Sequence, residues 1–122
     1  MRFGTVHLFN VFFDQVTYYG VASTMSAHVR VESSYFHDVT AAGQDPTYGP
    51  ITTRLPDSDP TGAGFIDALN NVEVGCGAPD VTAGQTDAWD PLVFYAFTPD
   101  AATTAPAVVQ SCASPRPTPT AP

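Results

Sequence analysis

Positive charge is scarce in this sequence. It has no lysine and only four arginines, against twelve acidic residues, so its formal net charge at pH 7 is −8. A surface of this kind repels nucleic acids and anionic membranes, and we expect neither as a partner. An acidic polysaccharide would also be repelled, unless a local group of arginines or a bound cation supplied the attraction.

Cysteine is rare as well, with only Cys76 and Cys112 in the chain. An even, low count fits one disulfide, formed in an oxidising compartment and tying the last strands to the C-terminal segment. Two buried free thiols are the alternative, because the sequence does not give the distance between the two Cα atoms. There is no Cys-x-x-Cys pair and the histidines are scattered, so we expect no metal site.

Long apolar runs are absent. None approaches the roughly 18 residues of a membrane span. Residues 1–16 lack the basic region, apolar core and cleavage site of a signal peptide, and begin directly with a strand pattern. Because the end of a stack of strands normally needs a cap, we expect Met1 to be an internal methionine of a longer protein.

The sequence does contain an internal repeat. Residues 6–16 (VHLFNVFFDQV) align with residues 29–39 (VRVESSYFHDV), so that Val6 falls on Val29 and Leu8 on Val31. Each copy begins with the apolar and polar alternation of a β-strand. The offset of about 23 residues is too short for a strand–helix–strand unit and fits one coil of a parallel β-helix. A chance match of two apolar strands is the alternative.

Further strands and loops are expected along the chain. A strand and turn are indicated at residues 17–24, and residues 65–76 resemble another coil. Four prolines and four glycines predict a long loop at 41–64, with one short strand at 48–52. The remaining segments are a loop at 77–90, a last strand at 91–97, and a short helix or strand at 105–112 across the end of the stack.

The chain therefore divides into two parts. Residues 1–113 form one domain, and residues 114–122 form a Pro/Thr-rich linker or tail, typical of secreted multi-domain proteins.

Several side chains are candidates for a site. His7 alternates with the inward residues Val6 and Leu8, so it points outward or into a turn, where we favour a structural role. Arg30 and Glu32 lie on the same face of one strand, which predicts a salt bridge between them.

Aromatic and acidic side chains offer weaker candidates. Tyr18, Tyr19 and Trp89 could stack on sugar rings, although packing is the simpler interpretation. Residues 57–62 (DSDPTG) resemble the start of a calcium-binding loop, but the position that should hold a glutamate is Ala68, and a proline disrupts the turn. We therefore do not predict a calcium site there.

The start of the sequence resembles the hallmark of the pectate lyase family, polysaccharide lyase family 1, which reads R-x-P-x-x-R-x-G-x-x-H-x-x-N-N-Y. The second arginine, the glycine, the histidine and the first asparagine of that hallmark match Arg2, Gly4, His7 and Asn10. Residues 19–36 are similar to the next coil of the family, and residues 88–109 loosely resemble its closing segment. The resemblance spans nearly all of residues 2–113.

Two departures from the family pattern matter. The asparagines that stack as a ladder at the coil turns of the family are replaced here by Val11 and by the pair Ser33–Ser34. Valine cannot bond to the next coil and serine does so weakly, which predicts weaker turns. The first arginine of the hallmark and the acidic calcium ligands of the family would lie before Met1.

The resemblance implies an all-β fold, a right-handed parallel β-helix of which this chain forms the C-terminal coils. It implies an extracellular enzyme that cleaves polygalacturonate (pectin) by elimination with the help of Ca²⁺. It also implies that Arg2 binds a substrate carboxylate through its guanidinium, whereas a frayed terminal side chain is the alternative.

The catalytic base of the family would be an arginine upstream of Met1. We therefore expect this chain to have no catalytic residue and little or no activity by itself. We also expect it to be a monomer. Two other functions stay open: a pectin lyase that acts on methylated substrate without calcium, and a non-catalytic β-helix that serves as a carbohydrate-binding or adhesion module.

Overall fold

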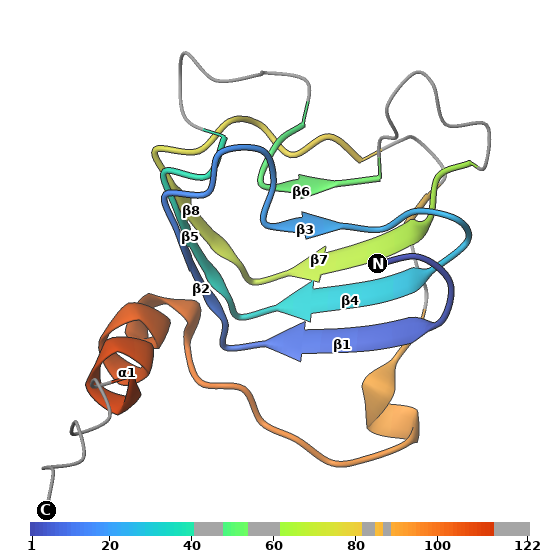
Figure 1. Cartoon of the computed structure of the whole chain (residues 1–122). Helices are drawn as coiled ribbons and strands as arrows, with labels where there is room; N and C mark the ends of the chain where they lie inside the picture. Colours follow the sequence, from blue (N-terminus) through green and yellow to red (C-terminus); the bar gives the residue numbers. More distant parts are fainter. Residues whose placement is uncertain (41–47, 54–61, 82–84, 87–88, 114–122) are drawn as a thin grey trace, which may run out of the picture.

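The computed structural model describes residues 1–40, 48–53, 62–81, 85–86 and 89–113, and most of their regular structure is β-strand (Figure 1). The first sheet contains β1 (Thr5–Phe9), β4 (His28–Glu32) and β7 (Phe65–Leu69). The second contains β2 (Phe12–Asp14), β5 (Tyr35–His37) and β8 (Val72–Val74). The third contains β3 (Val21–Ala22) and β6 (Ile51–Thr52).

The pairs between the strands named above are all parallel, and the chain visits the first, second and third sheets in turn. We call one such passage a circuit. The predicted repeat is confirmed in register, because Val6 lies opposite Val29 and Phe12 opposite Tyr35. The prediction of a further coil at 65–76 is also confirmed, by the pairing of β7 with β4 and of β8 with β5.

Single residues in the left-handed backbone region make the corners between the first and second sheets. They occupy equivalent places in the three circuits, with φ of 53°, 48° and 53° at Asn10, Ser33 and Asn70. Asparagine adopts this region more readily than most residues because its short polar side chain bonds locally. A second set, Gln15, Asp38 and Gly75, follows the strands of the second sheet with φ of 54°, 50° and 68°. The corners are therefore fixed by local sequence.

Alternate side chains along the strands fill the space between the sheets. Val29 of β4 and Ile66 of β7 are at most 1% exposed. Phe36 of β5 stacks on Phe13 of β2, with ring centroids 4.7 Å apart. Val6 of β1 is only partly buried, since β1 forms one edge of its sheet. The core thus continues from circuit to circuit, as the repeat predicts.

The prediction of a strand at 91–97 is wrong. The 3-10 helix η1 (Pro91–Val93) stands there instead, and Figure 1 shows the chain continuing past β1 as an extended but unpaired segment. The carboxylate of Asp90 accepts a hydrogen bond from the backbone nitrogen of Leu92 at 2.9 Å. Together with Pro91, whose φ is already fixed, this contact begins a helical turn and not a strand.

The end of the described chain is helical. A short 3-10 turn, η2 (Ala102–Thr104), leads into α1 (Ala105–Cys112), which lies beside β2 (Figure 1). Of the two alternatives for residues 105–112, the helix is therefore the one observed. No helix of the described residues is long and apolar enough to cross a membrane. The predicted tail at 114–122 lies outside the described residues.

Of the two alternatives for the cysteines, the disulfide is not the one observed, because Cys76 and Cys112 are both free thiols. Cys76 is half-buried and its sulfur accepts a weak hydrogen bond from the backbone nitrogen of Val39 at 3.4 Å. Burial raises the pKa of the Cys76 thiol. Cys112 is exposed on α1, so the alternative of two buried thiols is also wrong for this residue.

Candidate functional site

A row of polar side chains crosses the outer face of the first sheet. His7 of β1 lies opposite Arg30 of β4, and Arg30 lies opposite Asp67 of β7. Their neighbours along the strands, such as Val29, point into the core. Because side chains alternate between the two faces of a strand, the row lies on the face opposite the core. The in-register stack therefore places an imidazole, a guanidinium and a carboxylate side by side.

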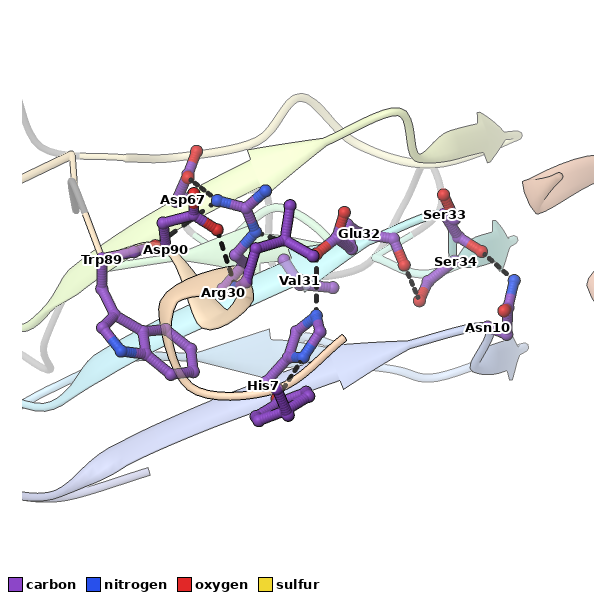
Figure 2. A network of polar contacts seen from close by, with 12 residues as sticks. His7, Asn10, Arg30, Val31, Glu32, Ser33, Ser34, Asp67, Trp89 and Asp90 are labelled. Carbon is purple, nitrogen blue, oxygen red and sulfur yellow. Dashed lines mark hydrogen bonds and ion pairs between the residues drawn. The ribbon is translucent and has the colours of Figure 1, made fainter. Parts of the chain in front are cut away.

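Glu32 joins this row into a network (Figure 2). Its Oε1 accepts from Nε2 of His7 at 2.7 Å and from Nε of Arg30 at 2.9 Å. The Glu32 side chain is 7% exposed and that of His7 is 3% exposed. The salt bridge predicted between Arg30 and Glu32 is confirmed, and the outward position predicted for His7 is confirmed as well.

Arg30 is held by more than one carboxylate. Its second contact is a bond from Nη1 to Oδ2 of Asp67 at 3.1 Å, and the same nitrogen points to the backbone oxygen of Trp89 at 3.4 Å. Burial by itself would lower the pKa of Arg30, but the hydrogen bond to Glu32 and the charges of Asp67 and Asp90 outweigh it and raise the pKa above its ordinary value. Arg30 thus stays positively charged, and its guanidinium is already bound to the neighbouring carboxylates.

Residues 89–100, which we call the covering segment, pack over this network. The hydroxyl of Tyr95 lies 2.6 Å from Nδ1 of His7, and the ring of Phe97 lies edge-on to His7 with centroids 4.5 Å apart. The carboxylate of Glu32 accepts only, so Nε2 of His7 carries a proton. In the neutral imidazole, Nδ1 then accepts from the Tyr95 hydroxyl. Both ring nitrogens of His7 are therefore engaged, which fits the structural role predicted for it.

Asn10 fastens the far end of the covering segment. Its Nδ2 donates to the backbone oxygen of Asp100 at 2.8 Å, and its Oδ1 accepts from the backbone nitrogen of Asp100 at 2.9 Å. The same Nδ2 also donates to the backbone oxygen of Ser33 in the next circuit at 3.0 Å. Asn10 therefore connects two circuits and the covering segment at one corner.

At the corners, serine and asparagine side chains together take the place of the asparagine ladder of the family pattern. Oγ of Ser34 accepts from the backbone nitrogen of Val11 at 3.1 Å and donates to the backbone oxygen of Glu32 at 3.1 Å. In the next circuit, Oδ1 of Asn71 accepts from the backbone nitrogen of Ser34 at 2.9 Å. Serine thus satisfies the backbone at the position where the sequence leads us to expect weak turns.

A pocket of about 410 Å³ opens between the first sheet and the covering segment. Its lining has no carboxylate or guanidinium group, and consists of Thr5, His7, Trp89, Phe94 and Tyr95. Phe94 is 70% exposed and Tyr95 is 43% exposed. The rings of Trp89 and Phe94 are 6.3 Å apart and inclined by 34°. The pocket therefore offers aromatic surface to solvent above a buried polar floor.

The structure places the remaining candidates elsewhere. Arg2 is exposed and pairs through its backbone with Thr24, outside both the network and the pocket. Tyr18 is 58% exposed, and Tyr19 packs edge-on against Tyr48 with centroids 5.9 Å apart. Residues 57–61 of the proposed calcium-like loop lie outside the described residues.

Among the residues that the structure describes, no three His, Cys, Asp or Glu side chains gather in a way that could hold a metal ion. The described residues therefore do not fit a calcium site.

The contribution of Tyr95 to the His7 network was not predicted from the sequence, and neither was the bond between Asn10 and Asp100. In both cases the partners are about ninety residues apart in the chain, beyond the reach of local patterns. The only sequence signal for these contacts is the run of aromatic residues at 94–97, and the alternation within this run favours a strand.

Comparison with protein-family models and with curated protein sequences finds no match. Among solved structures, the chain is similar to the pectate lyase Bsp165PelA from Bacillus sp. N165, determined in complex with trigalacturonate, with a TM-score of 0.69 and 27% sequence identity. The match covers 90% of this chain and 33% of the lyase, so the chain spans about a third of the length of this neighbour. Its parallel sheets thus form a pectate-lyase-like fold, and the similarity suggests a lyase at the family level.

Proposed function

We propose that this chain is the C-terminal part of the right-handed parallel β-helix of a secreted pectate lyase, whose substrate is polygalacturonate. The single observation that carries the proposal is the match over 90% of the chain to a pectate lyase that binds trigalacturonate. The hallmark residues Arg2, Gly4, His7 and Asn10 support it independently, because they match the family pattern by residue type and spacing alone.

In this proposal the reaction is a β-elimination. A base removes the proton next to the uronate carboxyl group, a carbon–carbon double bond forms, and the oxygen of the linked sugar leaves and is protonated. Negative charge develops near the carboxyl group, so cationic side chains stabilise the transition state. The catalytic base and any calcium ligands belong to the part of the enzyme that precedes these residues.

Arg2 is the substrate-binding residue that we assign to this chain. It is exposed at the start of the first circuit, and the backbone around it is held in place. The backbone nitrogen of Thr24 donates to the backbone oxygen of Met1 at 3.0 Å, and the hydroxyl of Thr24 donates to the same oxygen at 3.2 Å. A guanidinium so placed can bind a uronate carboxylate with two parallel hydrogen bonds, in a protein with few other cations.

The deciding experiment compares this chain with the protein encoded by its longest open reading frame. Polygalacturonate is supplied with calcium, and unsaturated product is followed by ultraviolet absorbance. The extended protein should release product and the 122-residue chain should not. Product released by the chain alone contradicts the assignment of the base to another part of the enzyme. Activity that survives a chelator indicates a pectin-lyase-like enzyme, and binding without product in the extended protein indicates a non-catalytic module.

The role of Arg2 is tested by binding of trigalacturonate to the 122-residue chain. Arg2→Ala should weaken binding roughly 5- to 10-fold, because an exposed charge-assisted hydrogen bond contributes about 1 to 1.5 kcal/mol. The matched control is Arg116→Ala, which removes an equal charge from the predicted tail and should leave binding unchanged. An equal loss in both variants would mean that only net charge matters.

A further inference from the structure

The pocket under the covering segment has no part in the elimination proposed above. Its lining residues, Thr5, His7, Trp89, Phe94 and Tyr95, do not include Arg2. We propose that this pocket is a second carbohydrate site, which binds a neutral sugar ring. The choice of a sugar rests on the proposed function, whereas the preference for a neutral one follows from the side chains themselves.

The walls of the pocket suit the apolar face of a sugar. Phe94 exposes 70% of its surface and Tyr95 exposes 43%, and the inclined rings of Trp89 and Phe94 leave aromatic surface facing solvent. A sugar ring carries C–H groups on its faces and hydroxyl groups around its edge. Aromatic residues with a polar handle bind such mixed surfaces well, because one end is apolar and the other can hydrogen-bond. Thr5 and Tyr95 are the lining residues with hydroxyl groups, and the Tyr95 hydroxyl, which bonds to His7, can still accept a hydrogen bond.

The charged side chains beneath the pocket are bound to one another, so they offer no cationic partner to an acidic sugar. Arg30 lies opposite His7 on the neighbouring strand, but it is bound to Glu32 at 2.9 Å and to Asp67 at 3.1 Å, so its guanidinium is not offered to a uronate. Glu32 also accepts from His7, and it is 7% exposed, so this carboxylate is not offered to a cation. An acidic sugar would give up part of its hydration against the aromatic walls without gaining a charged partner. A neutral ligand pays no such cost.

The two sites together point to a mixed substrate. Arg2 serves the acidic sugars of the main chain, and the pocket serves neutral sugars, such as those of side branches on the same polysaccharide. A protein with both would remain attached to a branched polymer while the main chain is cleaved. Linked sites of modest affinity raise the overall affinity in this way without any new contact.

The experiment uses the fact that Trp89 is the only tryptophan of the chain. Its fluorescence therefore reports on the pocket without background. The protein is titrated with α-1,4-linked galactobiose and with digalacturonate, which differ only in a hydroxymethyl group against a carboxylate on each ring. Galactobiose should give a saturable change in the fluorescence of Trp89. Its dissociation constant should be at least about 5-fold lower than that of digalacturonate, and tetramethylammonium chloride should give no change.

Variants locate the site. Phe94→Ala should weaken galactobiose binding about 2- to 10-fold, because aromatic contacts of this kind contribute about 0.5 to 1.5 kcal/mol. Tyr19→Ala, which removes an exposed aromatic ring outside the pocket, should leave binding unchanged, and circular dichroism should show that both variants fold. No saturable change with galactobiose, tighter binding of digalacturonate or of the ammonium ion, or equal effects of the two variants would each overturn the proposal. Lyase activity is measured separately, so failure here leaves the proposed function standing.

Discussion

Two histidine–carboxylate pairs in this protein have the same distance between nitrogen and oxygen but differ in burial. We predict that the buried pair contributes more to stability than the exposed pair. His7 and Glu32 are 2.7 Å apart, with side chains 3% and 7% exposed. His37 and Asp14 are also 2.7 Å apart, with side chains 40% and 47% exposed. The perturbations are Glu32→Gln and Asp14→Asn, each of which removes the charge and keeps the shape of the side chain.

The expected cost of Glu32→Gln follows from its contacts. The carboxylate accepts charge-assisted bonds from His7 and from Arg30, and each is worth about 1.5 to 3 kcal/mol when its partner is charged. A buried cation left unpaired would cost about 3 to 5 kcal/mol. Arg30 keeps Asp67 at 3.1 Å, however, so it is not left unpaired. We therefore expect a loss of about 2 kcal/mol in the free energy of unfolding.

For Asp14→Asn we expect a clearly smaller loss than for Glu32→Gln, because water competes for both partners at an exposed pair. The assay is urea unfolding of both variants and the parent protein, followed by circular dichroism and by the fluorescence of Trp89. The slope of free energy against urea should be unchanged, so that the midpoints report stability directly. Equal losses in the two variants, or an increase in stability for Glu32→Gln, would refute the reasoning from burial.

Three further predictions concern the corners, the packing of the circuits and pH. Ser34→Ala should cost about 1 to 3 kcal/mol in urea unfolding, because it leaves the backbone nitrogen of Val11 without its acceptor. Gly64→Ala should cost at least about 1 to 3 kcal/mol in the same assay, because a Cβ there would lie 2.6 Å from the backbone carbon of Ser23. The hydrogen bond to Asp14 raises the pKa of His37 above its ordinary value of 6.5, so its contribution is complete below that value and is lost as the pH rises through the folded pKa. An NMR titration of the His37 ring should therefore have its midpoint above 6.5, and the midpoint should fall in Asp14→Asn.

The stacking of the circuits could be predicted from the sequence because its determinants are local. The alternation of Val6 and Leu8 with polar residues gives the period of a strand, and the same pattern returns at Val29 and Val31. Once two copies share a period, burial of the apolar face fixes their register, since a slip of one residue would turn every side chain to the wrong side. The observed pairing of these residues is the one that the repeat predicts.

The covering segment could not be predicted in this way. Tyr95 and Phe97 alternate like the residues of a strand, but their spacing reflects two rings that reach the same histidine from outside the sheet. A strand needs a neighbour to bond with, and in the described residues this segment has none. Asp90 and Pro91 are local signals for a helical turn, and the prediction of a strand at 91–97 takes no account of them.

Asn10 explains why the substituted ladder holds. In the family pattern an asparagine would also stand at residue 11, yet the backbone nitrogen of Val11 is already satisfied by the hydroxyl of Ser34. Asn10 can then use both ends of its amide elsewhere, on Ser33 of the next circuit and on Asp100. An amide that bonds to a corner and to a distant segment couples the two, because each contact helps to hold the amide in the orientation that the other needs. The corner therefore also anchors the covering segment, and with it the position of Tyr95 over His7.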